Sequence, residues 1–220
     1  MKTFHELQEG VYDPNIFKAF FLAGGPGSGK SYVVRRTTGG LGLKVVNSDP
    51  HFERLIKDAG LSLSMPDAEF DSREPLRVRA KNVREKRKAN FIEGRLGIII
   101  DGTGKDANRL ISQSKGLLEL GYDTHMIFVN TSLDVALQRN SERPRSVPKP
   151  IVVNAWKDVQ KNIGQFTQHF RGNFVAVDNN DASEDELAKV WKIVRNLVGK
   201  KVVNTRAKNW IAMELSKKRK

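Results

Sequence analysis

The sequence predicts an α/β fold, a three-layer αβα sandwich with about five parallel strands and a helical insertion between strands two and three. Two observations predict it. Apolar runs with the length of strands alternate with amphipathic helical patterns, the order that produces a parallel sheet with right-handed crossovers. A glycine-rich stretch at residues 24–31 joins the first strand to the first helix and fits a phosphate-binding loop.

The glycine-rich stretch matches G-x-x-x-x-G-K-[ST] in full, and we expect all eight residues to bind the nucleotide: Gly24, Gly25, Pro26, Gly27, Ser28, Gly29, Lys30 and Ser31. In this pattern backbone N–H groups surround a phosphate, the Lys30 ammonium reaches its outer oxygens and the Ser31 hydroxyl holds Mg²⁺. The apolar run 19–23 precedes it as a strand, and the following helix presents its N-terminus to the anion. The sequence therefore predicts a P-loop NTPase fold that binds a nucleoside triphosphate with Mg²⁺; ATP is the expected cofactor, although the loop itself does not separate ATP from GTP.

Four further strands are predicted after the loop, at residues 43–47, 97–101, 124–130 and 173–177. Residues 51–95 form the helical insertion, in which a long helix runs from about residue 74 to 95 with Pro75 in its first turn. Near the C-terminus, Ser183 and Glu186 form the pattern of a capping box and begin the last helix of the sandwich.

Length and composition indicate one domain, residues 1–199, followed by a basic C-terminal tail at 200–220. Within this domain, residues 51–95 are expected to bind the acceptor and 139–150 to form a lid.

The net charge of +13 indicates attraction to polyanions such as nucleic acid. The absence of cysteine excludes disulfides and cysteine-based metal sites. No stretch resembles a membrane span or a signal peptide, so we expect a cytoplasmic protein.

The acids that end predicted strands two and three lie at the edge where parallel sheets bind ligands. Asp49 ends strand two and is placed to orient an acceptor hydroxyl and accept its proton; a turn residue or an acid near Mg²⁺ is the alternative. Asp101 ends strand three and, with Ser31, is a predicted Mg²⁺ ligand, directly or through water. Alternatively, Asp101 and Thr103 contact the acceptor, or Asp101 serves only the turn.

Arginines follow strand four in the proline-rich segment that we predict to be a lid. Arg139, Arg143 and Arg145 can fold over the triphosphate there and, together with Lys30, stabilise the charge of the transferring phosphoryl group. The alternative is that they are ordinary surface arginines.

The long helix of the insertion is strongly basic from residue 74 onward. Such a run is often only a solvated surface. Its place between strands two and three favours a role in binding the acceptor, and we expect contacts from Arg77, Arg84 and Arg87 in addition to Asp49 and Thr103.

These motifs, in this order, resemble the P-loop kinases that include phage polynucleotide 5′-kinase, the zeta-toxin kinases and the phage kinases that act on 5-hydroxymethyluracil in DNA. The resemblance covers residues 18–180 and rests on the loop, on residues 46–49 and 100–103, and on the arginines after strand four. It implies that Asp49 is the general base and that the arginines form a lid. One departure is that no arginine follows Asp49 closely; Arg54 comes late.

The leading hypothesis is a kinase that transfers the γ-phosphoryl group of ATP to a hydroxyl of a nucleic acid, DNA in particular, in the host cytoplasm if a phage encodes the protein. A nucleoside or nucleotide kinase is an alternative, and a toxin-type assignment would imply a uridine-diphosphate-sugar acceptor. An alternative of another class is a nucleotide-gated nucleic-acid-binding protein that hydrolyses little.

Overall fold

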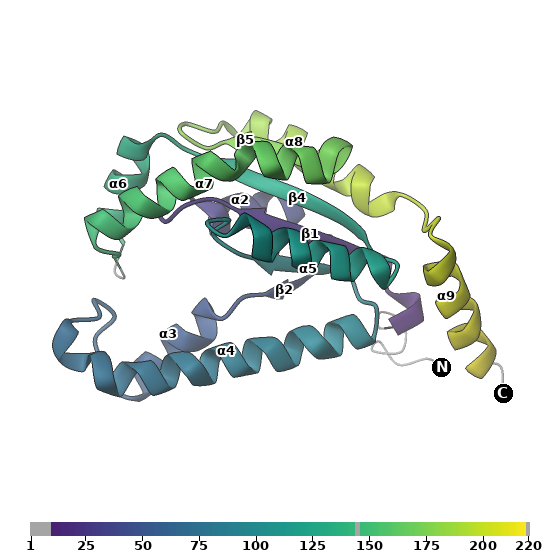
Figure 1. The fold of residues 1–220 in the computed structure, drawn as a ribbon, viewed down its shortest axis with the longest axis horizontal. Coiled ribbons are helices and arrows are strands. Elements are labelled where there is room, and N and C mark those ends of the chain that lie inside the picture. The colour runs from purple at the N-terminus through teal and green to yellow at the C-terminus, as the bar shows by residue number, and fades with distance from the viewer. Residues whose placement is uncertain (1–9, 144–145, 219–220) are drawn as a thin grey trace.

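The computed structural model describes residues 10–143 and 146–218, which form one sheet flanked by helices (Figure 1). The five strands are parallel and lie in the order β2-β3-β1-β4-β5. Their bounds are β1 Lys18–Ala23, β2 Lys44–Val46, β3 Ile98–Asp101, β4 Asp123–Asn130 and β5 Phe174–Asp178. The α/β sandwich predicted from the sequence is confirmed.

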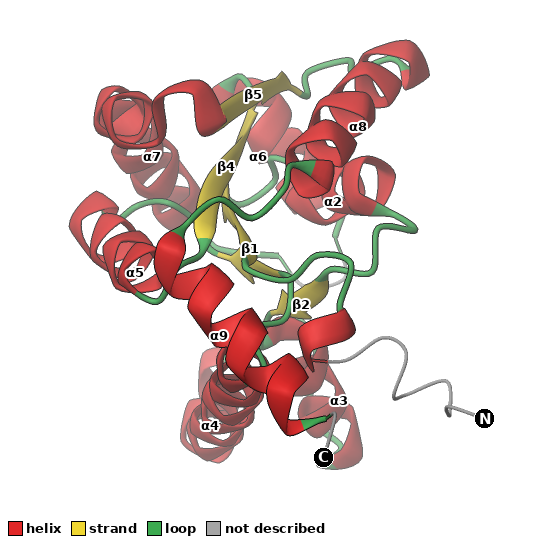
Figure 2. Cartoon of the chain, turned by 90° about the vertical axis from the view of Figure 1, so that its right-hand side faces the viewer, coloured by secondary structure: helices red, strands yellow, loops and turns green. Residues whose placement is uncertain are grey.

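Strand β1 lies at the centre of the sheet, and every one of its residues is buried. Alternate side chains of a strand point to opposite faces, so β1 contributes to two separate cores. Phe21 faces a core built with helices α5 (Ala107–Glu119) and α7 (Lys149–Phe170). Phe20 faces the other core, which is built with α2 (Lys30–Thr38) and α8 (Glu184–Gly199). Figure 2 shows these two helix pairs on opposite sides of the sheet.

The insertion consists of helices α3 (Asp49–Asp58) and α4 (Phe70–Glu93), joined through the short 3-10 helix η2 (Asp67–Glu69). It has a small core of its own, made by Phe52, Leu55, Ile56 and Ala80. Helix α4 runs along one side of the molecule beneath the sheet (Figure 1). The insertion is therefore a packed unit, and its helix α4 also contacts β2.

Two details of the insertion differ from the sequence prediction. Helix α4 begins at Phe70 rather than near residue 74, so Pro75 lies in its second turn. A proline disfavours helical backbone at the residue before it, so the sequence predicts that the helix begins next to Pro75, later than it does in the structure. Asp49 and Pro50 form the first turn of α3, whereas the sequence suggested a turn that closes the strand. Proline is well tolerated there because the first helical N–H groups have no partner within the helix.

The remaining elements are η1 (Gly10–Tyr12), α6 (Leu133–Ser141), η3 (Arg171–Asn173) and α9 (Thr205–Lys217). Helix α9 accounts for most of the segment that the sequence suggested to be a tail. It is packed rather than loose: Ala207 is fully buried, and the Trp210 ring lies 5.6 Å from the Phe17 ring. Across the described residues, no helix combines the length and the apolar character needed to cross a membrane.

Candidate active site

The glycine-rich loop follows β1 and is shaped by close backbone contacts. Gly27 and Gly29 have φ angles of 78° and 79°, a region that favours glycine. A Cβ atom on Gly27 would lie 2.0 Å from the Ala136 carbonyl oxygen, and one on Gly29 would lie 2.3 Å from Nδ2 of Asn179. Helix α6 and the loop after β5 therefore press directly on the phosphate-binding loop, so two of its glycines are required by packing as well as by φ.

Lys30 is the first residue of α2, and its side chain folds back over the loop. Its Nζ donates to the carbonyl oxygens of Gly24 and Gly25, at 2.6 and 3.3 Å. Burial lowers the pKa of the Lys30 ammonium, while the nearby carboxylates of Asp101 and Asp49 act in the opposite direction. Asp101 and Asp49 therefore lie close enough to the Lys30 ammonium to favour its charged form.

Two side chains hold the loop after β5, one by tying it to the phosphate-binding loop and the other by tying it to α6. Asn179 is 4% exposed, and its Nδ2 donates to the Ser28 carbonyl oxygen at 2.7 Å. Arg139 projects from α6 and donates to the carbonyl oxygens of Asn179 and Asn180, at 2.5 and 2.7 Å. Its guanidinium thus has two backbone partners in this structure, which indicates a part in holding the loop as well as the predicted contact with phosphate.

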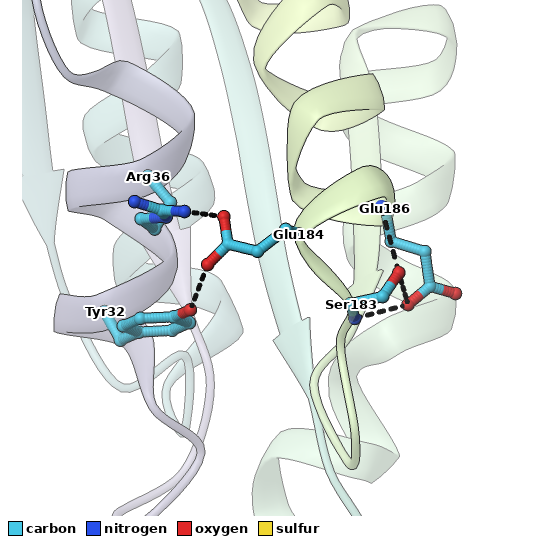
Figure 3. Close-up of polar contacts among 5 residues, drawn as sticks. All are labelled: Tyr32, Arg36, Ser183, Glu184 and Glu186. Carbon is cyan, nitrogen blue, oxygen red and sulfur yellow. Dashed lines mark hydrogen bonds and ion pairs between the residues drawn. The ribbon is translucent and has the colours of Figure 1, made fainter.

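Helix α2, which starts in the phosphate-binding loop, is also fastened to α8 (Figure 3). The Glu184 carboxylate pairs with Arg36 and accepts a hydrogen bond from the Tyr32 hydroxyl at 3.3 Å. The predicted capping box is present: Ser183 Oγ accepts from the backbone N–H of Glu186, and the Glu186 carboxylate accepts from that of Ser183. The start of α8 is therefore fixed beside the nucleotide side of the site.

The two predicted strand-end acids are joined by Asn47. Its Nδ2 donates to Oδ2 of Asp101 at 2.7 Å, and its Oδ1 accepts from the backbone N–H of Asp49 at 2.8 Å. Burial raises the pKa of the Asp101 carboxyl; Lys30 lowers it and Asp49 raises it further. The Asn47 amide thus helps to position both acids, the half-buried Asp101 and the exposed Asp49, which lie at the ends of adjacent strands.

A cleft of about 590 Å³, here called the central cleft, contains most of the predicted site. It is lined by the loop residues Gly25, Pro26, Gly27, Gly29, Lys30 and Ser31, and also by Asp49, Arg84, Asp101, Thr103, Arg139 and Arg143. Gly24 and Ser28 lie behind this surface and are buried in the loop. Arg145 lies outside the described residues. The structure therefore brings the loop, both acids and two of the three predicted lid arginines together.

Two smaller pockets share lining residues with the central cleft, and each contains one of these acids, Asp101 or Asp49. The α4–α5 pocket, about 190 Å³, shares Arg84, Asp101, Gly102 and Thr103 with the cleft and adds Lys88, Lys105 and Arg109. The α3–α4 pocket, about 150 Å³, shares Ser48 and Asp49 and adds Phe52, Met65, Arg77, Ala80, Lys81 and Val147. Of the predicted acceptor arginines, Arg77 and Arg84 therefore line the site, whereas the Arg87 guanidinium lies 5.8 Å over the Phe91 ring, away from these pockets.

Sequence reasoning missed several residues that the structure places at the site. Asn47 and Asn179 stand next to strand ends, a position that could have indicated them, but each also donates to a residue that is distant in sequence, Asp101 and Ser28 respectively. Lys88 and Arg109 face each other across the α4–α5 pocket from different helices. Burial lowers the pKa of Lys88, and Arg84 and Arg109 lower it further, so three positive charges converge there.

The profile of the zeta toxin family matches residues 8–188 of this sequence. The chain belongs to the zeta toxin family. It is accordingly an ATP-dependent P-loop kinase, and the resemblance inferred from the motifs is confirmed.

Solved structures agree with the fold of this zeta toxin family member. A protein from Chloroflexus aurantiacus, provisionally described as a kinase, superimposes with a TM-score of 0.51 at 15% identity, over 83% of this chain and 97% of the other. Shikimate kinase from Bacteroides thetaiotaomicron superimposes with a TM-score of 0.50 at 14% identity, over 83% of this chain and 99% of the other. At these identities the likeness concerns the fold alone. No curated protein matches the sequence.

Proposed function

We propose that this kinase transfers the γ-phosphoryl group of ATP to a hydroxyl of a nucleic acid, with DNA as the main candidate. The observation that carries the proposal is the face of α4 that meets the site. Arg77 and Lys81 line the α3–α4 pocket, Arg84 and Lys88 line the α4–α5 pocket, and each of these pockets shares residues with the central cleft. At 1.5 Å per residue the four cations span about 16 Å of helix, which is about five steps of a nucleic-acid strand at 3.4 Å each.

Such a row of cations suits an extended polyanion better than a single small anion. The four cations line pockets that each share residues with the central cleft, so they are placed to bind successive phosphates on both sides of the reacting hydroxyl. A hydroxyl on a base of duplex DNA must leave the base stack to reach a buried site. The pockets beside Asp49 and Asp101 are where such a group would enter.

Several residues of the central cleft have defined roles in this scheme. Backbone N–H groups of the loop and Lys30 bind the phosphates of ATP, and Arg143 adds positive charge near the transferring group. Asp49 orients the acceptor hydroxyl and accepts its proton as the oxygen attacks phosphorus and the bond to the leaving ADP oxygen breaks. Arg84 lies between the cleft and the α4–α5 pocket, where it can contact the acceptor.

The residues present fit Mg²⁺. The Ser31 hydroxyl and the Asp101 carboxylate line the same cleft and are oxygen ligands of the kind that Mg²⁺ prefers, and this ion is commonly held by one or two carboxylates plus substrate phosphates. Residues 10–143 and 146–218 contain no cluster of three acids, histidines or cysteines that could hold a metal ion. When bound, Mg²⁺ would neutralise charge on the phosphates.

The second candidate acceptor is a nucleotide-linked sugar, such as a uridine-diphosphate sugar. The family match favours it, and the α4–α5 pocket could receive a small diphosphate between Arg84, Lys88 and Arg109. This acceptor does not account for the cations that continue along α4 into the α3–α4 pocket.

An assay with γ-labelled ATP separates the two candidates. The acceptors are DNA that carries 5-hydroxymethyluracil, DNA and RNA with 5′-hydroxyl ends, nucleosides, nucleotides and a uridine-diphosphate sugar. We expect label in DNA, with an acceptor KM that rises steeply with salt because bound phosphates release counterions. Arg84→Gln should raise that KM, while the matched control Lys192→Gln, an exposed position on α8, should not. Label in small molecules only would refute the proposal.

A further inference from the structure

The positive charge of the chain is concentrated in two segments. Residues 70–93, which form α4, contain eight Lys or Arg and four Asp or Glu, a net charge of +4. Residues 200–220 contain eight Lys or Arg and one acid, Glu214, a net charge of +7. Since the whole chain carries +13, the other 175 residues together carry only +2. The basic character is therefore a property of α4 and of the C-terminal segment.

These two segments meet in space although they lie more than a hundred residues apart in the sequence. The Arg95 guanidinium, just after α4, lies 5.8 Å from the centre of the Trp210 ring of α9. A groove between the helices is lined by Ala89 and Ile92 on one side and by Trp210 and Met213 on the other. Figure 1 shows α9 standing at the C-terminal end of α4.

Helix α9 is held in place by its own contacts, so its charges are presented on a fixed surface. Asn204 caps it by accepting from the backbone N–H of Arg206, and the Arg206 guanidinium donates to the Glu119 carbonyl oxygen at 2.5 Å. Ala207 is fully buried against the sheet domain. A fixed surface loses less entropy when it binds a ligand than a loose tail does.

The exposed cations of this segment point to a polyanionic partner. Lys201, Lys208, Lys217 and Lys218 are all exposed, and the single acid of the segment, Glu214, pairs with Lys217. Residues 200–218 also lie beyond the residues that match the zeta toxin family, 8–188. This basic surface is thus an addition to the matched kinase domain, placed beside the basic helix of the acceptor side.

We infer that the exposed basic surface of residues 200–218 is a second nucleic-acid contact, which binds phosphates several nucleotides away from the one that is phosphorylated. The inference rests on the proposed function. From Arg84 to the end of α4 is about 14 Å at 1.5 Å per residue, or about four nucleotide steps at 3.4 Å. A nucleic acid that follows α4 out of the site therefore reaches α9 only if it extends beyond about four nucleotides.

The inference is tested with a triple variant, Lys201→Gln/Lys208→Gln/Lys217→Gln. The matched control is Lys157→Gln/Lys189→Gln/Lys192→Gln, which removes three exposed lysines from α7 and α8. Binding of a fluorescent 30-nucleotide DNA and of a 4-nucleotide DNA is measured by anisotropy over a range of salt. Transfer of label from ATP to both DNAs is measured in parallel, and thermal unfolding checks that both variants are folded.

The variant Lys201→Gln/Lys208→Gln/Lys217→Gln should bind the 30-nucleotide DNA about tenfold more weakly or worse. A plot of the logarithm of its binding constant against the logarithm of the salt concentration should be less steep, by up to about three. Binding of the 4-nucleotide DNA and the KM for ATP should not change, and the control should behave as the parent protein. Equal binding of the long DNA by the two triple variants would overturn the inference. Absence of transfer to any nucleic acid, with α9-dependent binding retained, would overturn the proposed function and leave the second contact standing.

Discussion

The nucleotide side and the acceptor side of the site differ in how their polar side chains are held. On the nucleotide side, Lys30, Arg139 and Asn179 each donate to backbone carbonyl oxygens. On the acceptor side, Arg84 and Lys88 share one carboxylate, Glu85, and face Arg109 across the α4–α5 pocket. One side is stabilised by bonds within the protein, and the other gathers like charges.

This difference indicates how the two substrates are recognised. Asn179 and Arg139 already hold the loops of the nucleotide side through hydrogen bonds, so these loops need little reorganisation when ATP binds, and preorganised groups are the more effective in catalysis. Like charges held close together repel each other until an anion enters between them. Under the proposed function, we therefore expect the nucleotide side to provide a fixed donor site and the selection of the acceptor to depend on the negative charge that it brings to α4.

The largest effect is expected from Lys30→Ala, which tests whether the nucleotide side depends on one cation. We expect kcat/KM for ATP to fall by about 10³ or more, because loss of a single group that stabilises transition-state charge already costs about 10²–10³. The affinity of the free protein for the nucleic-acid acceptor should stay the same. Lys57→Ala, on an exposed turn of α3, is the control, and normal transfer by Lys30→Ala would refute the donor-site assignment.

Asp49→Asn tests the junction between the two sides. A general base contributes about 10²–10⁴ to the rate, so kcat should drop by that factor while ATP and acceptor still bind. Asp58→Asn changes an exposed acid at the other end of α3 and should leave kcat unchanged. If Asp49→Asn instead raised the KM for ATP with kcat retained, Asp49 would belong to the nucleotide side.

The sequence was informative wherever chemistry is encoded by neighbouring residues. The loop from Gly24 to Ser31 is contiguous, and Asp101 directly ends an apolar run, so both could be placed from local pattern alone. Contacts between distant segments could not: Asn179 reaches Ser28 across 151 residues. The sequence also could not show which basic side chains of α4 meet the site. In the structure Arg84 lines the cleft, whereas the Arg87 guanidinium lies over the Phe91 ring.

Asn47→Ala tests the amide that positions both carboxylates. Outer partners of a metal ligand typically change metal affinity by about 10- to 100-fold, so the Mg²⁺ concentration for half-maximal activity should rise by a factor in that range. The exposed amide of Asn82 on α4 provides the control Asn82→Ala. An unchanged Mg²⁺ dependence would show that Asp101 does not act as a Mg²⁺ ligand oriented by Asn47.

Asn179→Ala should affect the nucleotide side only. It leaves the Ser28 carbonyl oxygen without its donor, which costs about 1–3 kcal/mol of stability for a buried acceptor. Because the loop is then held less firmly, we expect the KM for ATP to rise several-fold while the acceptor KM stays constant. A rise in the acceptor KM of the same size would remove the distinction between the two sides; Asn196→Ala on α8 is the control.

The smallest effect on catalysis is expected at His125, which lies near the amino end of β4, 2% exposed and stacked on Phe20 with ring centres 4.7 Å apart. Burial lowers its pKa to about 4; Lys18 and Lys200 act in the same direction, and Asp123 opposes them. Only the unfolded chain takes up this proton between pH 6.5 and about 4, so the folded state loses stability as pH falls through that window.

The loss amounts to roughly 2 kcal/mol between pH 7 and pH 5 for this histidine alone. His125→Phe should therefore flatten the decline in unfolding free energy by that amount, measured by denaturant titration at both pH values, while kcat and both KM values at pH 7.5 stay as in the parent. Carboxylates contribute equally to the pH dependence of the unfolding free energy in the parent and in His125→Phe. The difference in pH dependence between the two proteins therefore reports on His125 alone. If the unfolding free energy of His125→Phe depended on pH as that of the parent does, the His125 ring could be protonated in the folded state. An altered KM would show that a change at the amino edge of the sheet affects substrate binding at one side of the site.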